Sequence, residues 1–153
     1  MIETKPLGIC NLDEAVALYR ELIGEYAHAD ARLARVATDE RSLKSMLQYS
    51  FDVEDDLFLL AYARAEAVGF VDSSRILVDG GEDEWYIKAV YLREPYRSLE
   101  RFAQLVSRVE REVFARGVRL VFSNALMEDN EANTLWESLG YEIGERRRVK
   151  VLR

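Results

Sequence analysis

The sequence predicts an α/β fold: a mixed, mostly antiparallel, twisted sheet of roughly six or seven strands with helices on both faces. Residues 57–63, 68–78 and 84–92 form three successive strand-like runs joined by short polar turns, which indicates an antiparallel meander. Residues 99–116 then carry apolar side chains at helical spacing, and an apolar strand pattern follows at 118–124. A strand, a helix and a strand in this order predict parallel neighbours joined by a right-handed crossover.

The elements before the meander are a strand and two helices. "MIETKPL" alternates weakly and predicts an opening strand, and Asn11 with Glu14 three residues later resembles a capping box at a helix start. Thr38 and Asp39 offer a cap for a second, shorter helix, which the acidic run "DVEDD" (52–56) ends.

Three glycines mark a close approach within the sheet and the ends of two helices. Gly69 lies inside a strand pattern, which predicts the close approach of another backbone or of a ligand. Gly117 ends the helix that begins near Ser98, and Gly140 ends a last helix capped by Asp129 or Asn130. With an extended segment at 141–152, the predicted order is β-α-α-β-β-β-α-β-α-β.

Composition narrows the class of protein. The 153 residues favour a single domain over 1–153, and the net charge of −7 argues against general nucleic-acid binding. Cys10 is the only cysteine, so we expect no disulfide within the chain and no zinc or redox motif. No apolar run is long enough to span a bilayer. We therefore expect a cytoplasmic protein that binds neither nucleic acid nor membrane and holds no metal.

Two short stretches carry a family resemblance. "YLREPYRS" (91–98) and "ANTLWESLGYE" (132–142), in this order of elements, resemble the GNAT superfamily of N-acetyltransferases. Family members typically show Arg or Gln followed by x-x-Gly-x-Gly/Ala in the first stretch and A-x-x-L-Y-E-x-L-G-F in the second. The resemblance implies transfer of an acetyl or other acyl group from acetyl-CoA to a primary amine of a small molecule or peptide. It also makes a homodimer plausible.

The resemblance also implies a cofactor site. The backbone at the end of strand 84–92 would bind the pantetheine arm, and the next turn and helix start would bind the pyrophosphate. Asn130 would contact the pantetheine or only cap its helix. The cofactor-binding residues expected on this basis are Val90, Tyr91, Leu92, Arg97, Ser98, Leu99, Arg101 and Asn130.

Three positions depart from the family pattern. Glu100 stands at the first loop glycine, where a carboxylate facing the pyrophosphate would cost about 1 kcal/mol unless arginines offset it or Glu100 points away. Phe102 stands at the Gly/Ala position and fits the apolar stripe of its helix, which indicates a core residue. Trp136 replaces the tyrosine that protonates the leaving thiolate in many relatives, and an indole N–H is not a usable acid.

Glu84 is the candidate catalytic base, because it begins the strand whose other end meets the cofactor. The alternative is a solvated carboxylate at a loop–strand junction. Glu54 and Asp55 would line an amine entrance or simply be solvated. The substitutions at Glu100, Phe102 and Trp136 fall at positions where the family binds its cofactor or protonates the thiolate. A second function class therefore stays open: a catalytically degenerate GNAT-fold protein acting as a binding or regulatory module.

Overall fold

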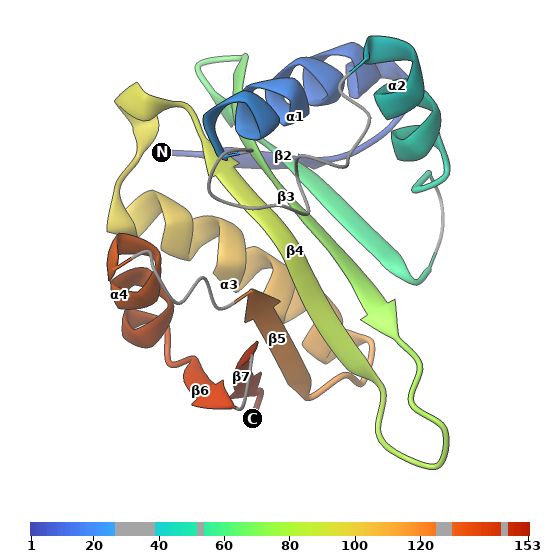
Figure 1. Cartoon of the computed structure of the whole chain (residues 1–153), viewed down its shortest axis with the longest axis vertical. Coiled ribbons are helices and arrows are strands. Elements are labelled where there is room, and N and C mark those ends of the chain that lie inside the picture. Colours follow the sequence, from blue (N-terminus) through green and yellow to red (C-terminus); the bar gives the residue numbers. More distant parts are fainter. Residues whose placement is uncertain (27–38, 52–53, 125–129, 145–146) are drawn as a thin grey trace.

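The computed structural model describes residues 1–26, 39–51, 54–124, 130–144 and 147–153. A seven-stranded sheet of order β1-β2-β3-β4-β5-β7-β6 forms its centre (Figure 1). The strands are β1 Glu3–Pro6, β2 Asp56–Ala63, β3 Glu66–Ile76, β4 Glu84–Leu92, β5 Leu120–Asn124, β6 Glu142–Gly144 and β7 Arg147–Val151. The helices are α1 Leu12–Tyr26, α2 Glu40–Gln48, α3 Leu99–Ala115 and α4 Asn130–Ser138, with short 3-10 turns at Ile9–Asn11 and Glu94–Tyr96.

The predicted fold class and strand directions are confirmed. Strands β2, β3 and β4 form the antiparallel meander, and β4 and β5 are parallel neighbours joined through α3. The last predicted strand is in fact two, because 141–152 contains the antiparallel partners β6 and β7. Within the described residues, no helix is both long and apolar enough to cross a membrane.

Two apolar cores hold the helices against the sheet. On one face, α1 and α2 bury side chains such as Leu18, Leu43 and Leu47 against Phe58 and Phe70 of the sheet. On the other face, α3 and α4 cover strands β2 to β5, and their apolar residues join Trp85 and Ile87. Each fully buried side chain of this size contributes about 1.5–3 kcal/mol relative to exposure. The helical stripes read from the sequence are thus the sides of the helices that pack against the sheet.

Three predicted helix-end signals are confirmed and one is wrong, while the side chains of Asp129 and Asn130, the predicted caps of α4, lie outside the described residues. The Asp39 side chain accepts from the Ser42 N–H at 2.8 Å, and Gly117 and Gly140 both adopt a φ of +86° just after their helices. The capping-box interpretation of Asn11 was wrong. A 3-10 turn precedes α1, so the Asn11 Oδ1 accepts from the Gly8 N–H at 2.8 Å instead of turning toward the first turn of α1.

The prediction for Gly69 is confirmed. A Cβ at this position would lie 2.2 Å from the Tyr91 backbone oxygen on β4. Gly69 therefore lets β3 and β4 approach at the end of β4, where the candidate site begins.

Candidate active site

The site is built around the place where the pairing of two parallel strands ends. The β4–β5 pairing runs from Glu84↔Leu120 to Ile87↔Ser123 and stops there, while β4 continues along β3 to Leu92. The β3–β4 register shifts between Asp72 and Ser73, which leaves Lys88 as the extra residue of a β-bulge. A bulge bends its strand, and this one lies where β4 leaves β5. The pairing of β4 with β5 therefore ends five residues before β4 itself ends at Leu92.

Beyond the bulge, β4 directs backbone groups into the gap beside β5. The Arg93 N–H donates to the Val68 O of β3 at 2.8 Å. Because antiparallel pairing alternates along a strand, Tyr91 also directs its backbone groups to β3, while Val90 and Leu92 direct theirs to the gap. The Leu92 O accepts from Arg97 Nε at 2.6 Å. Both backbone groups of Val90 and the Leu92 N–H thus face the gap.

The turn after β4 leads into the N-terminus of α3. Ser98 caps this helix, since its Oγ accepts from the Arg101 N–H at 3.2 Å. The N–H groups of Leu99 and Glu100 precede the first intrahelical bonds, so they project from the helix end. The Glu100 side chain is exposed, and Phe102 packs against the α3-side core as predicted.

The two arginines of this turn are engaged within the protein. Arg97 Nη2 lies 2.5 Å from Glu25 Oε2 of α1, and its guanidinium lies over the Tyr91 ring at 5.5 Å from the centroid. Arg101 Nη1 donates to the Tyr96 O at 3.4 Å, and its guanidinium lies over the Tyr96 ring. The predicted phosphate anchor Arg97 is therefore held by a carboxylate from the opposite side of the turn.

Glu21 and Glu25 of α1 form a network with the end of β4. The Tyr91 hydroxyl donates to both carboxylates, at 3.2 and 3.1 Å, and Arg93 pairs with Glu21 at 2.9 Å. Burial and then the hydrogen bond to Glu25 raise the pKa of Tyr91 above its ordinary value, so the phenol stays protonated as a donor. Sequence reasoning missed Glu21 and Glu25; their only signal is the i, i+4 spacing of two acidic residues on one helix face.

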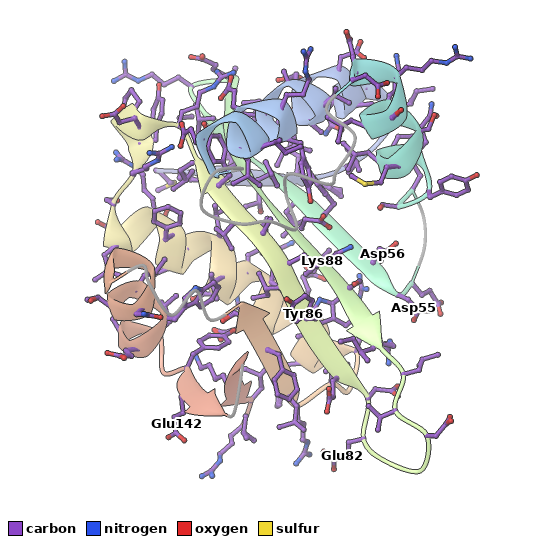
Figure 2. All side chains as sticks on the ribbon, viewed as in Figure 1. Asp55, Asp56, Glu82, Tyr86, Lys88 and Glu142 are labelled. Atoms are coloured by element: carbon purple, nitrogen blue, oxygen red, sulfur yellow. The ribbon has the colours of Figure 1, made fainter. Side chains whose placement is uncertain are left out.

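Glu84, Tyr86 and Lys88 share the α1 side of β4. Trp85 and Ile87 lie in the α3-side core, so the alternate residues Glu84 and Tyr86 face the other way. Figure 2 shows Tyr86 and Lys88 along β4 and Asp56 near the start of β2, below α1 and α2 in this view. Glu84 lies three residues before the last β4–β5 pair, at roughly 10 Å along the strand, since a strand rises about 3.3 Å per residue.

A buried carboxylate fixes the bulge from the α1 side. Asp72 of β3 is buried; its Oδ1 lies 3.5 Å from Lys88 Nζ, and its Oδ2 accepts from the Tyr19 hydroxyl at 3.1 Å. Burial raises the pKa of the Asp72 carboxyl above its ordinary value, and the Lys88 charge opposes that rise. Sequence reasoning missed Asp72, although one acidic residue inside an apolar strand pattern was an available signal.

Four acidic residues, Glu54, Asp55, Glu82 and Asp83, lie at the opposite end of the meander from the α1 network. Asp55, a predicted entrance residue, is paired with Arg75 at 3.1 Å, and Arg75 also holds Asp83 at 2.8 Å. Glu54 and Glu82 are exposed. Across the described part of the chain, no three His, Cys, Asp or Glu side chains gather as a metal site would require.

The structure describes the side chain of only one of the residues that the sequence analysis singled out in and before α4. Trp136 is buried and meets the Tyr141 ring edge-on at 5.0 Å between centroids, so it is a core side chain. Asn130 is the first residue of α4, but its side chain lies outside the described residues, as does Asp129.

A match to a protein-family model shows which family this chain belongs to. The model of the acetyltransferase (GNAT) family matches residues 15–141. The chain belongs to the GNAT family. No curated protein matches this GNAT chain.

Solved structures share the GNAT fold at low identity. One is the aminoglycoside N-acetyltransferase AAC(6′)-Iy in complex with CoA, with 17% identity, a TM-score of 0.78, and coverage of 95% of this chain and 91% of that one. Another is the PaiA N-acetyltransferase of Thermoplasma acidophilum with coenzyme A, with 17% identity, a TM-score of 0.76, and coverage of 100% and 99%. A third is Arabidopsis thaliana NAA60 with a bisubstrate analogue, with 15% identity, a TM-score of 0.72, and coverage of 100% of both chains.

Proposed function

We propose that residues 1–153 form one GNAT domain that transfers an acetyl group from acetyl-CoA to a primary amine of a small molecule or peptide. The observation that carries this proposal is that β4–β5 pairing ends at Ile87↔Ser123 while β4 continues to Leu92, so that the backbone of Val90 and Leu92 faces away from β3 without a β5 partner. Two structures of this fold were solved with CoA, which supports the choice of donor.

The residues present fit an acyl-CoA. Val90 and the Leu92 N–H would hold the amide groups of the pantetheine arm, with Asn130 as a further candidate contact. The N–H groups of Leu99 and Glu100 would meet the pyrophosphate at the positive end of α3. The Glu100 side chain is exposed, and its backbone N–H lies in the first turn of α3, where it has no intrahelical acceptor, even though the family glycine is absent. Bound acetyl-CoA supplies an activated acyl group as its thioester.

The acceptor would approach from the α1 side of β4. Glu84 lies on that face, roughly 10 Å along β4 from the last β4–β5 pair. It would therefore take the proton of the substrate ammonium through water. The carboxylates of Glu84 and Asp56 favour a cationic amine on this side, in keeping with the net charge of −7. Among the neighbours are aminoglycoside acetyltransferases, which supports an amine acceptor.

Calorimetric titration with acetyl-CoA tests the proposal. We expect saturable binding and a higher unfolding temperature, since a ligand at 100 times its Kd stabilises the native state by about 2.7 kcal/mol. Pantetheine without the nucleotide should bind more weakly, because it leaves the α3 terminus uncontacted. The absence of any response to millimolar acetyl-CoA or longer acyl-CoAs would contradict the proposal.

A GNAT-fold binding or regulatory module is the second candidate. The pairing of Arg97 with Glu25 favours it, because the arginine expected to hold phosphate already has a partner. Acyl-CoA binding without thiol release, across a panel of amines, would support this second function. We also propose a cytoplasmic location and a homodimer; light scattering tests the latter.

Replacing Glu25 with Gln is expected to tighten CoA binding by roughly two- to fivefold. A phosphate that recruits Arg97 must displace the Glu25 carboxylate, and a partly exposed pair of this kind is worth about 0.2–1 kcal/mol. Calorimetry measures the effect. The matched control is Glu66→Gln, which removes a carboxylate 3.2 Å from Arg93 instead. Equal dissociation constants for the two variants would show that Glu25 does not compete with phosphate.

A further inference from the structure

Ser123 carries a buried hydroxyl that no described group binds. Its side chain is fully buried, and its Oγ has no hydrogen-bond partner among the described residues. Ser73 of β3 is equally buried, but its Oγ donates to the Leu57 O at 2.8 Å. Since nearly all buried polar groups in native proteins are paired, an unpaired one within a candidate active site points to a ligand.

The position of Ser123 says which part of a ligand it would meet. Ser123 is the last β5 residue paired with β4, opposite Ile87, so it stands where the gap between the strands closes. Val121, two residues earlier on β5, and Ile87 both lie in the α3-side core. Because side chains alternate along a strand, the Ser123 hydroxyl lies on that same side of the sheet.

We propose that the Ser123 hydroxyl donates a hydrogen bond to the sulfur of the acyl-CoA thioester and to the CoA thiolate that leaves. This inference rests on the proposed function. A pantetheine arm bonded to Val90 and Leu92 runs along β4 toward the closed end of the gap, and the sulfur is at the deep end of the arm. The pair Ile87–Ser123 forms that closed end, so the unpaired hydroxyl and the sulfur come together there.

The hydrogen bond acts on the charge that develops during transfer. The amine nitrogen attacks the thioester carbonyl carbon, a C–N bond forms, the C–S bond breaks, and its electron pair goes to sulfur. The ammonium proton passes through water to Glu84. Ser123 keeps its own proton, because a hydroxyl is a far weaker acid than a thiol, and the thiolate takes a proton from solvent after release. Trp136, which stands at the position of the family's tyrosine, cannot supply this proton, since an indole N–H is not a usable acid.

The charged groups around this side of the sheet are already paired or lie on other strands. Glu110 of α3 is held by Lys150 Nζ at 2.8 Å and by the Tyr141 hydroxyl at 3.5 Å. Lys88 pairs with Asp72 on the α1 side. On β7, Arg148 stands opposite Ser123 in the register, but its side chain lies outside the described residues. A Ser123→Ala variant keeps all of these charges, so a comparison with the wild type isolates the hydroxyl.

The test compares the binding of CoA, whose thiol titrates, with that of acetyl-CoA, which has no thiol. Calorimetry between pH 6.5 and 9.5 is expected to show that wild-type affinity for CoA rises with pH relative to acetyl-CoA. In the Ser123→Ala variant, this gain in CoA affinity should be smaller by a factor of at least about ten. The reason is that a hydrogen bond to the thiolate lowers the pKa of the bound CoA thiol by roughly 1–2 units. The Ser73→Ala control should keep the wild-type profile.

Stability without ligand gives a second, independent readout. Removing an unpaired buried hydroxyl is expected to raise the unfolding temperature of Ser123→Ala by roughly 2–4 °C, whereas Ser73→Ala should lower it. A Ser123→Ala protein that unfolds, or that binds CoA with the wild-type pH profile, would overturn this inference alone. A wild-type protein that binds no CoA would overturn the proposed function and this inference with it.

Discussion

The Glu84→Gln variant is expected to lose about two to four orders of magnitude in kcat while binding acetyl-CoA with unchanged affinity. The loss follows because glutamine cannot take the proton of the substrate ammonium. The affinity is retained because Glu84 lies roughly 10 Å before the last β4–β5 pair, away from Val90 and Leu92. Thiol release measured with a panel of polyamines, aminoglycosides and peptide N-termini gives kcat, and calorimetry gives the affinity.

The matched control for Glu84 is Glu82→Gln. Glu82 is an exposed carboxylate in the loop before β4, so its removal makes the same change of charge two residues before Glu84. Its kcat should stay within about twofold of the wild type if only long-range electrostatics is altered. A higher pH should partly restore the Glu84→Gln rate, because more of the amine is already deprotonated. A kcat equal to that of Glu82→Gln would rule out Glu84 as the base.

The sequence predicted the scaffold because its signals are local. The α3 stripe, the glycine at 117 and the apolar run of β2 each depend on neighbouring residues, and periodicity is sufficient to read them. Gly69 was also readable, since a glycine inside a strand has few structural uses. These features fix the sheet, the crossover and therefore the place where β4 leaves β5.

The contacts within the site were not predictable in the same way. Glu25 and Arg97 are 72 residues apart, and their pairing depends on where the end of α1 meets the turn after β4. The bulge at Lys88 is a register shift that no local pattern marks. The direction of Glu100 was left open because a first-turn carboxylate is compatible with either orientation; the structure shows it exposed. Ser123 gave no signal, because an isolated serine in a strand carries no pattern.

Replacing Gly69 with Ala is expected to destabilise the protein by at least about 3 kcal/mol, the range of severe overpacking. The new Cβ would lie 2.2 Å from the Tyr91 O, 2.7 Å from Leu92 Cδ2 and 3.1 Å from Leu92 Cα. The nearest of these atoms is backbone, so a rotamer change cannot relieve the overlap and β3 must move away from β4. Urea unfolding followed by tryptophan fluorescence measures the loss, which corresponds to roughly 6–12 °C in Tm for a chain of this size.

Gly24→Ala is the control for this substitution. A Cβ on Gly24 meets no atom within 4 Å, and Gly24 lies inside α1, so alanine there should stabilise the helix by up to about 1 kcal/mol. The same change of side chain thus has opposite expected signs at the two glycines. Because the Gly69 overlap falls on Tyr91 and Leu92, any Gly69→Ala protein that still folds should also bind acetyl-CoA more weakly. A variant within 1 kcal/mol of the wild type, with unchanged affinity, would show that the β3–β4 spacing is not what positions the Val90 and Leu92 backbone.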